Sequence, residues 1–352
     1  MKKIGIITFH RTTNFGSVLQ TYGLYRKIEL LGEKPEIIDY RCKAIEEREQ
    51  LKNKLVFTPR EIVKRILFFP VVKKKGEQLA AFLQEKTNFS TTVDSSNINQ
   101  ISKQYDKVFV GSDIVWGRDI TEHDYNYFLK FVADDYKKYA YASSVGDYKQ
   151  YDDDDDIGEL LGKFNKIAVR EDEAQKWVTD ISGKDSELVC DPTMLLTADE
   201  WERETHPQKY NENYVLVYFD SPQNKCLNDA ITYAKSRGLS VFYINYGLKI
   251  KGTKSVKPTT ISEFLGLIKY ANTIFTASYH GMLFSLYFNK NFYFYTRAHS
   301  SRVISLAKTV GVYDRLGDNS ITETEIDYVV VNKKMEDFRN NSIAILGEML
   351  SE

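Results

Sequence analysis

The amino-acid sequence predicts a soluble α/β protein with two domains, each built on a parallel sheet. The chain has 352 residues, more than the roughly 150 of an ordinary domain. Short apolar segments typical of buried strands alternate with longer segments of helical periodicity. The alternation breaks at a polar stretch, residues 197–213, and then starts again. Strands that alternate with helices predict parallel sheets covered by helices on both faces.

The first domain is expected over residues 1–196. It opens with a strand at 4–9, a helix at 16–31 that Gly32 ends, and a second strand at 35–40. Further short apolar runs lie at 108–110, 139–142 and 167–169. This order of elements is typical of a doubly wound, Rossmann-like sheet.

The second domain is expected over residues 197–330, after a linker at 197–213. Its predicted strands lie at 214–219, 240–244, 273–276 and 292–295, and its predicted helices at 225–236, 261–270, 280–288 and from 301. We expect two Rossmann-like halves that face each other across a cleft. A final helix within residues 331–352 packs on one half or bridges both.

Two segments depart from the alternation. An insertion at about 41–90 is basic, because residues 41–75 hold more than twice as many lysines and arginines as acids. The favoured interpretation is a helical insertion packed on the first sheet; the alternative is a segment that rests on an anionic membrane surface. The run of five aspartates at 152–156 is expected to be a solvated loop rather than a metal site, because adjacent carboxylates repel.

Composition excludes several classes of protein. Lys and Arg number 48 and Asp and Glu 49, so the chain has no overall bias toward nucleic acid. No apolar run approaches the roughly 20 residues of a membrane span, and the N-terminus lacks the features of a signal peptide. Cys42, Cys190 and Cys226 are scattered, with no spacing that could hold zinc. We therefore expect a cytoplasmic protein.

The span from Phe264 to Tyr313 contains no Asp or Glu. In a chain whose charges nearly cancel, this predicts a positive surface on the second domain, facing an anionic ligand. The alternative is that much of the span is buried and therefore carries few acids. The basic residues of the span are Lys269, His280, Lys290, Arg297, His299, Arg302 and Lys308.

The turn Thr276-Ala277-Ser278-Tyr279-His280-Gly281 lies within this span, between a predicted strand and a predicted helix. Ser278 is the expected N-cap of that helix. In a doubly wound sheet such a turn lies at the carboxyl edge, where helix N–H groups attract anions. His280 would stand in the first helical turn, where an imidazole can supply or accept a proton; the alternative is a structural histidine.

Three segments of the first domain are expected at its own carboxyl edge. Arg170 ends the strand at 167–169, where it could clamp a carboxylate or phosphate, or instead form a salt bridge with Glu171 or Asp172. The turn at 13–17 and the tripeptide at 111–113 follow other strands. Neither carries G-x-G-x-x-G, so dinucleotide binding is poorly supported.

Together these segments resemble the polysaccharide pyruvyl transferase family. The matching motifs occur in order between about residues 4 and 316. They are Asn14-Phe15-Gly16 with Val18-Leu19-Gln20, Val110-Gly111-Ser112-Asp113-Ile114-Val115-Trp116, Tyr139-Ala140-Tyr141-Ala142-Ser143-Ser144, Val169-Arg170-Glu171, Asp191-Pro192-Thr193, and Thr276 to Gly281 with Phe284-Ser285.

The resemblance implies a GT-B-like pair of domains and a reaction that moves a pyruvyl group from phosphoenolpyruvate to two hydroxyls of a sugar. The sugar would belong to a capsule, exopolysaccharide or cell-wall precursor. No metal and no cofactor beyond the phosphoenolpyruvate substrate is implied. His280 matches the general acid of the family, and Arg170 matches an arginine that holds the donor.

The sequence departs from the family pattern at the central turn. An arginine is expected two positions before the histidine, where this chain has Ser278. Arg302, or else Arg297, would then supply the missing cation of a donor site that also includes Ser278 and Gly281. Ala277 and Ile114 replace an expected aspartate and glutamine.

The resemblance also implies an acceptor side, formed by Asn14, Gly16, Ser112 and Asp113, with Asp113 orienting or deprotonating the sugar hydroxyl. The expected partners are a small donor and a glycan or lipid-linked acceptor, with no nucleic acid. A lipid-linked acceptor would bring the protein to the inner face of the membrane. Two alternatives remain: a GT-B-type glycosyltransferase that uses a nucleotide-sugar, and a binding protein of the same fold without catalysis.

Overall fold

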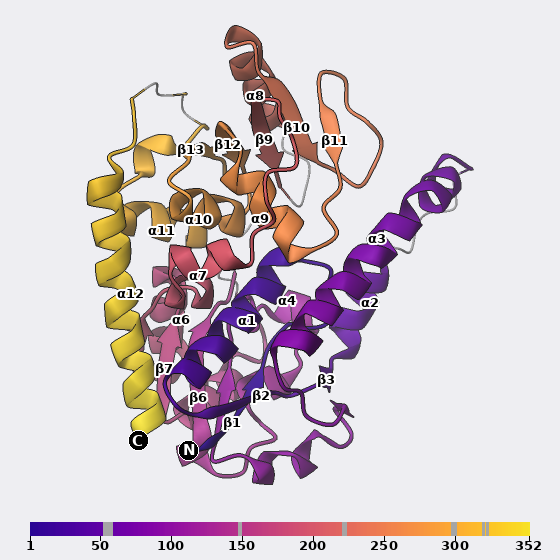
Figure 1. The fold of residues 1–352 in the computed structure, drawn as a ribbon. Coiled ribbons are helices and arrows are strands. Elements are labelled where there is room, and N and C mark those ends of the chain that lie inside the picture. The colour runs from indigo at the N-terminus through magenta and orange to yellow at the C-terminus, as the bar shows by residue number, and fades with distance from the viewer. Residues whose placement is uncertain (52–58, 147–149, 220–223, 297–300, 319–320, 322–323) are drawn as a thin grey trace. The chain divides into compact units, whose positions relative to one another are not determined.

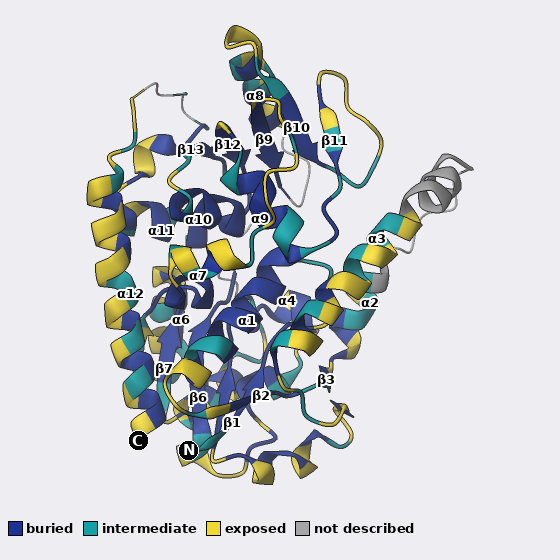
Figure 2. Ribbon diagram, viewed as in Figure 1, coloured by how far each residue is buried: buried dark blue, intermediate teal, exposed yellow. Residues whose placement is uncertain are grey.

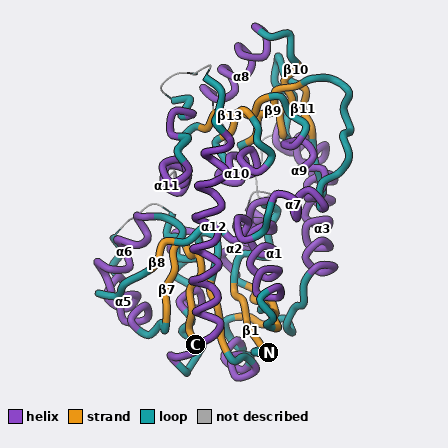
Figure 3. The backbone as a smooth tube through the Cα atoms, turned by 60° about the vertical axis from the view of Figure 1, so that its left-hand side comes forward, coloured by secondary structure: helices purple, strands orange, loops and turns teal. Residues whose placement is uncertain are grey.

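The computed structural model describes residues 1–51, 59–146, 150–219, 224–296, 301–318, 321 and 324–352, with side chains left undescribed at 50, 51 and 59–68. The chain folds into two compact units. Unit 1 contains residues 1–52, 83–196 and 336–352, and unit 2 contains residues 53–82 and 197–335. In each unit strands run side by side with helices around them (Figure 3).

Unit 1 is built on a parallel sheet of the order β2-β1-β5-β6-β7-β8. The strands are β1 (Lys3–Ile7), β2 (Lys34–Ile37), β5 (Lys107–Val110), β6 (Lys138–Ser143), β7 (Lys166–Val169) and β8 (Glu187–Leu188). Most of their residues are buried, as expected for strands covered on both faces. A small parallel pair, β3 (Tyr40–Arg41) and β4 (Val93–Asp94), lies outside this sheet.

The helices that belong to unit 1 connect these strands (Figure 1). They are α1 (Phe15–Leu30), α2 (Lys43–Leu51), α4 (Arg118–Thr121), α5 (Asp154–Gly162) and α6 (Asp172–Ser182), with 3₁₀ turns at Ile98–Gln100, Ser102–Gln104, Tyr125–Phe128, Asp135–Lys137 and Pro192–Leu195. The long C-terminal helix α12 (Tyr328–Ser351) contributes its part from Glu336 onward. Buried Lys107 Nζ donates to the Met349 carbonyl at 2.5 Å, which fixes the end of α12 on unit 1.

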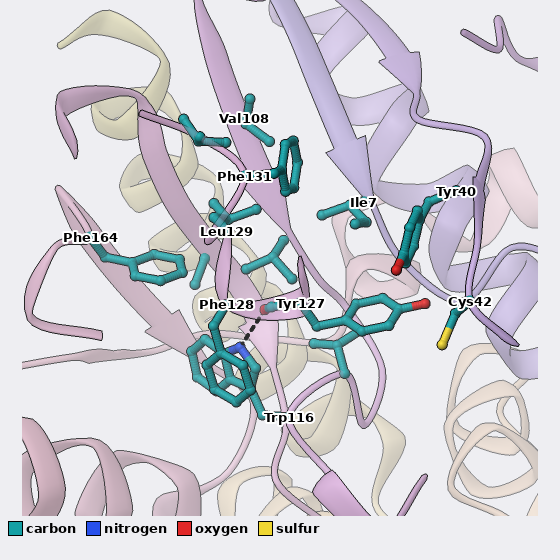
Figure 4. Packing of buried hydrophobic residues seen from close by; sticks show 14 of the residues in the cluster. Ile7, Tyr40, Cys42, Val108, Trp116, Tyr127, Phe128, Leu129, Phe131 and Phe164 are labelled. Carbon is teal, nitrogen blue, oxygen red and sulfur yellow. Dashed lines mark hydrogen bonds between the residues drawn. The ribbon is translucent and has the colours of Figure 1, made fainter. Parts of the chain in front are cut away.

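Several aromatic side chains pack together in the core of unit 1 (Figure 4). Trp116 is 1% exposed and stacks on Phe128, with ring centres 5.9 Å apart. Its indole Nε1 donates to the Tyr127 carbonyl at 2.9 Å, so this buried polar atom is paired. The core therefore fixes the loop after β5, which carries the predicted Gly111-Ser112-Asp113 site.

Unit 2 is built on a second parallel sheet, of the order β11-β10-β9-β12-β13. The strands are β9 (Tyr214–Tyr218), β10 (Ser240–Ile244), β11 (Lys254–Val256), β12 (Thr273–Thr276) and β13 (Asn291–Phe294). The helices are α7 (Ala198–Arg203), α8 (Asn224–Ser236), α9 (Ile261–Lys269), α10 (Tyr279–Tyr287) and α11 (Ser301–Val310), with a 3₁₀ turn at Tyr313–Arg315. Residues 53–82, which include most of α3 (Pro59–Lys86), also belong to this unit.

One expectation about a loop is wrong, and the predicted linker, which begins at the boundary between the units, contains a helix. The aspartate run is not a freely solvated loop, because α5 begins at Asp154 and buried Arg118 binds both Asp153 and Asp154, at 2.7 and 2.5 Å. The polar stretch after residue 197 contains α7, whose Thr197 and Glu200 form a reciprocal capping box. In both places, side-chain hydrogen bonds to a helix start give structure to a polar segment.

Candidate functional site

The first turn of α1 lies at the carboxyl edge of the unit 1 sheet, directly after β1. Asn14 is its N-cap, and Asn14 Oδ1 accepts from the Gly16 N–H at 2.8 Å. An asparagine cap satisfies one of the helix N–H groups that have no partner within the helix. The structure therefore places both predicted residues in the cap of α1.

The loop after β5 is fastened to α1. The Ser112 N–H donates to Gln20 Oε1 at 3.1 Å, and Thr8 Oγ1 donates to the Ser112 carbonyl at 3.0 Å. Ser17 Oγ donates to Asp113 Oδ2. These bonds bring the α1 cap and the Ser112-Asp113 pair together at one sheet edge.

Arg170 follows β7 at the same edge, and its side chain is completely buried. Nη1 lies 2.6 Å from Asp191 Oδ2, and carboxylate oxygens of Asp113 and Glu171 lie 3.9 Å from other guanidinium nitrogens. The opposite Asp191 oxygen accepts from Thr193 at both its N–H and its hydroxyl. The short pair is thus with Asp191, which the sequence offered only as part of a motif, and not with Glu171 or Asp172.

Arg170 and the carboxylates around it determine the electrostatics at the carboxyl edge of the unit 1 sheet. One buried guanidinium is surrounded by three carboxylates within 4 Å, those of Asp113, Glu171 and Asp191. Charges that are taken out of water need such partners, because desolvation is costly. Arg170 therefore holds Asp113 beside Ser17, and a carboxylate held in this way can accept a hydrogen bond from a hydroxyl-bearing ligand.

The predicted turn of unit 2 connects β12 to α10. Thr276 Oγ1 donates to the Tyr218 carbonyl at 2.6 Å and accepts from the Ser278 N–H at 3.0 Å. Ser278 is the N-cap of α10, with its Oγ 3.4 Å from the Gly281 nitrogen. A Cβ at Gly281 would collide with Thr276 Oγ1 and lie 3.0 Å from the Tyr218 ring, so only glycine fits this close approach.

His280 stands in the first turn of α10 and is 7% exposed. Its ring centre lies 5.2 Å from that of Tyr279, in an edge-to-face arrangement. Arg302, near the start of α11 and also 7% exposed, has its Cζ 5.8 Å from the Tyr279 ring centre. Tyr279, which the sequence did not single out, therefore contacts both the predicted acid and the predicted cation.

The remaining predicted site residue, Arg297, lies outside the described residues, as does His299. Within unit 2 the structure thus brings together Ser278, His280, Gly281 and Arg302 at the end of β12 and the start of α11.

Acids from outside the acid-free span reach parts of it. Lys269 lies at the end of α9 and pairs with Glu202 at 3.0 Å, away from the turn. Asp318, from outside the span, reaches the end of β13, where its Oδ2 accepts from the Thr296 N–H at 2.8 Å. The sequence count missed this carboxylate because the sheet edge is assembled from segments distant in the chain.

A cavity of about 430 Å³ lies elsewhere in unit 2. It runs beside α9 and is lined by, among others, Tyr210, Tyr214, Lys257, Glu263 and Tyr270. The described candidate site residues at the two sheet edges do not line this cavity. Among the residues whose placement is described, no group of three or more His, Cys, Asp or Glu side chains could hold a metal ion, and no helix is long and apolar enough to cross a bilayer.

Comparison with solved structures shows the fold. The chain is similar to a UDP-GlcNAc 2-epimerase from Neisseria meningitidis bound to UDP-GlcNAc, with a TM-score of 0.50, 8% identity and 99% of each chain covered. It is also similar to MurG of Acinetobacter baumannii (TM-score 0.43, 9% identity, 100% and 99% covered) and to the glycosyltransferase SsfS6 of Streptomyces sp. SF2575 (TM-score 0.44, 10% identity, 100% of both). Of these three only the epimerase reaches 0.5, and identities this low show a shared fold alone. The predicted GT-B-like pair of Rossmann-like domains is confirmed.

Comparison of the sequences shows the family. No curated protein sequence matches the chain. The family described as polysaccharide pyruvyl transferase, however, matches residues 14–299, which run from the α1 cap of unit 1 to the segment after β13 of unit 2. That range includes the predicted site residues except Arg302. The chain therefore belongs to the polysaccharide pyruvyl transferase family.

Proposed function

We propose that the protein transfers a pyruvyl group from phosphoenolpyruvate to two hydroxyls of a sugar in a cell-surface glycan precursor. One observation carries the proposal: in a member of this family, an imidazole and a guanidinium flank one tyrosine ring at the carboxyl end of β12. The reaction needs a proton donor and a cation, which are the groups that His280 and Arg302 provide.

His280 gives a proton to the methylene carbon of the enol, while one sugar hydroxyl attacks the neighbouring carbon and forms the first C–O bond. The second hydroxyl then forms the second C–O bond as the bond to phosphate breaks. Of the two hydroxyl protons, one replaces the proton that His280 gave and the other leaves with phosphate. The products are a cyclic ketal of pyruvate and inorganic phosphate.

On the donor side, Arg302 would bind the phosphate or carboxylate in place of the arginine that Ser278 replaces, with Arg297 as a second candidate. A guanidinium suits a planar or tetrahedral oxyanion because it offers several donors in a fixed geometry. The N-terminal turn of α10, with Ser278 and Gly281, adds helix N–H groups to the same site.

On the acceptor side, Asn14, Gly16, Ser112 and Asp113 would meet the sugar, with Asp113 as the acceptor of a hydroxyl hydrogen bond. Arg170 would either hold the donor, as the family resemblance implies, or position Asp113, 3.9 Å away. A lipid-linked acceptor would bring the protein, which we expect in the cytoplasm, to the inner face of the membrane. The basic insertion at 41–75 could contribute there.

The test is phosphate release from phosphoenolpyruvate in the presence of candidate glycan acceptors, with the ketal product identified by mass. His280→Ala is expected to lower kcat about 10²- to 10⁴-fold, the usual contribution of a general acid. His123→Ala is the control, since this histidine binds Asp153 in unit 1 at 2.7 Å. Full turnover by His280→Ala, with the wild type active, would contradict the role given to His280.

A nucleotide-sugar glycosyltransferase is the second candidate, and the position of Asp318 favours it. This carboxylate at the end of β13 could hold a ribose or sugar hydroxyl. Thermal shift separates the candidates, because a ligand at 100 times its Kd adds about 2.7 kcal/mol to the free energy of unfolding. Stabilisation by UDP-sugars and none by phosphoenolpyruvate would favour the glycosyltransferase. Stabilisation by phosphoenolpyruvate without turnover on any acceptor would favour a non-catalytic binding protein.

A further inference from the structure

The loop between β10 and β11 exposes aliphatic side chains between lysines. Leu248 is 44% exposed and Ile250 is 37% exposed, and Lys249 and Lys251 beside them are exposed as well. Figure 2 shows this loop in yellow over much of its length. An apolar side chain exposed alone is ordinary, whereas aliphatic and basic residues that alternate on one loop call for an explanation.

A second segment of unit 2 has the same character. In α3, Phe69 is 44% exposed and is followed by exposed Lys73 and Lys74. The next residue, Lys75, places its Nζ 4.6 Å from the ring centre of Tyr246, which precedes the β10–β11 loop tip by two residues. Lys75 therefore connects α3 to the β10–β11 loop within unit 2.

The backbone of the loop tip is fixed by its own hydrogen bonds. Asn245 Nδ2 donates to the Leu248 carbonyl at 2.7 Å, and Asn245 Oδ1 accepts from the Gly247 N–H at 2.8 Å. Thr253 donates to the Ile250 carbonyl from its N–H and from its hydroxyl. A loop that is already ordered loses little conformational entropy when it binds, so its exposed aliphatic groups are prepared for contact.

We propose that these residues bind the surface of an anionic lipid bilayer. The lysine–aliphatic surface is defined as Leu248, Lys249, Ile250 and Lys251. Lysines are attracted to anionic headgroups, each adding about fivefold to binding at low salt, while aliphatic and aromatic side chains enter the boundary of the acyl chains.

The combination favours a bilayer over a nucleic acid. A nucleic acid would use the lysines but would gain little from Leu248 and Ile250, because its groove and backbone contacts are mainly polar and ionic. The proposal does not depend on the transferase chemistry, although β9, β10 and β12 are parallel and the loop after β10 therefore lies at the same sheet edge as the turn after β12. Membrane binding at this edge would explain how an enzyme acting on a lipid-linked acceptor reaches it.

The test is co-sedimentation of the full chain with vesicles that contain about 30% anionic phospholipid, without donor or acceptor, at about 0.05 M and about 0.5 M salt. We expect the wild type to bind at low salt and to bind at least tenfold more weakly to neutral vesicles. Leu248→Ser with Ile250→Ser should weaken binding about tenfold, and Lys249→Glu with Lys251→Glu by more than tenfold.

The matched control is Val329→Ser with Val330→Ser. These valines are 83% and 49% exposed at the start of α12 and follow Asp327 rather than a lysine. Equal losses in the control and the loop variants would overturn the proposal, as would a wild type that ignores anionic vesicles. The proposal would also be overturned if the Leu248→Ser/Ile250→Ser variant still bound vesicles and bound duplex DNA equally well. In that case the lysines would bind polyanions in general. An unchanged melting temperature of each variant shows that folding is intact.

Discussion

At the carboxyl edge of unit 1, charged groups hold the polar loops in place. Arg170 Nη1 lies 2.6 Å from Asp191, and Asp113 is held between Arg170 and Ser17. At the carboxyl edge of unit 2, close packing does the same work: Thr276 Oγ1 binds the Tyr218 carbonyl at 2.6 Å, and Gly281 packs against both residues.

The difference shows that two units with the same type of sheet can hold their carboxyl edges in place by different interactions. An edge held by buried charge is rigid, but each charge depends on its partners. An edge held by a hydroxyl and a glycine needs no ionic partner for these contacts. Substitutions in unit 1 should therefore act first on stability, and those around His280 first on catalysis.

The largest expected effect tests the charged edge. Arg170→Ala would leave the buried carboxylates of Asp191 and Glu171 without their cation, at a cost of about 3–5 kcal/mol in the free energy of unfolding. Arg26→Ala is the control, since this exposed arginine pairs with Glu29 at the surface and should cost at most about 0.5 kcal/mol. Chemical denaturation measures both. Similar small losses would mean that Arg170 is not needed to neutralise the edge.

A variant that keeps the charge separates stability from donor binding. Arg170→Lys retains a cation but loses the planar fork of donors. If Arg170 holds the donor, the KM for phosphoenolpyruvate rises in this variant while the free energy of unfolding changes little. If Arg170 only positions Asp113, the KM for the acceptor rises instead.

A smaller effect tests the edge held by packing. Gly281→Ala would drive a methyl group into Thr276 Oγ1 and the Tyr218 ring, at a cost of about 1–3 kcal/mol. Gly162→Ala, at the end of α5, has open space around the added methyl and should be neutral or slightly stabilising. Because the methyl group shifts the first turn of α10, we also expect kcat to fall more than the melting temperature suggests. Equal stability of the two variants would show that the turn can relax.

The sequence predicted the repeated α/β alternation and most strand positions, because buried parallel strands are short, continuous apolar runs. The restart at Tyr214 and the Ser278 cap could likewise be read locally. Contacts between residues that are distant in the sequence could not be predicted in this way. The Arg170–Asp191 ion pair joins residues 21 positions apart, and nothing in the sequence favours Asp191 over the adjacent Glu171.

Contacts between distant residues also determine where charges lie in unit 2. A count along the chain found no acid between Phe264 and Tyr313, yet Asp318 folds back onto Thr296. Tyr279 was overlooked for the opposite reason, since an aromatic residue at a helix start carries no recognisable signal until Arg302 is seen beside it.

The smallest expected effect concerns acid, and it acts on the edge of unit 1. Asp39 follows β2 and accepts from His10 at 2.9 Å and from Arg11 at 2.7 and 2.8 Å. Burial alone would raise the pKa of this carboxyl, but hydrogen bonds from His10, Arg11 and Thr92 outweigh burial and hold the pKa well below its ordinary value. A carboxyl with a lowered folded-state pKa stabilises the protein above its unfolded value of about 3.9, and this stability is lost as pH falls below that value.

Acid should therefore loosen the β2 edge before it affects the turn at His280. Hydrogen exchange at about pH 5 and about pH 3 is expected to show faster opening of residues 34–41 at the lower pH, with a smaller change at 276–281. Asp39→Asn should open the same segment already at pH 5 and make it less sensitive to further acid, whereas Asp155→Asn, at an exposed position, should behave as the wild type. If acid opened both segments equally in the wild type, the contrast between a charged edge and a packed edge would not hold, because both would then depend on carboxylates.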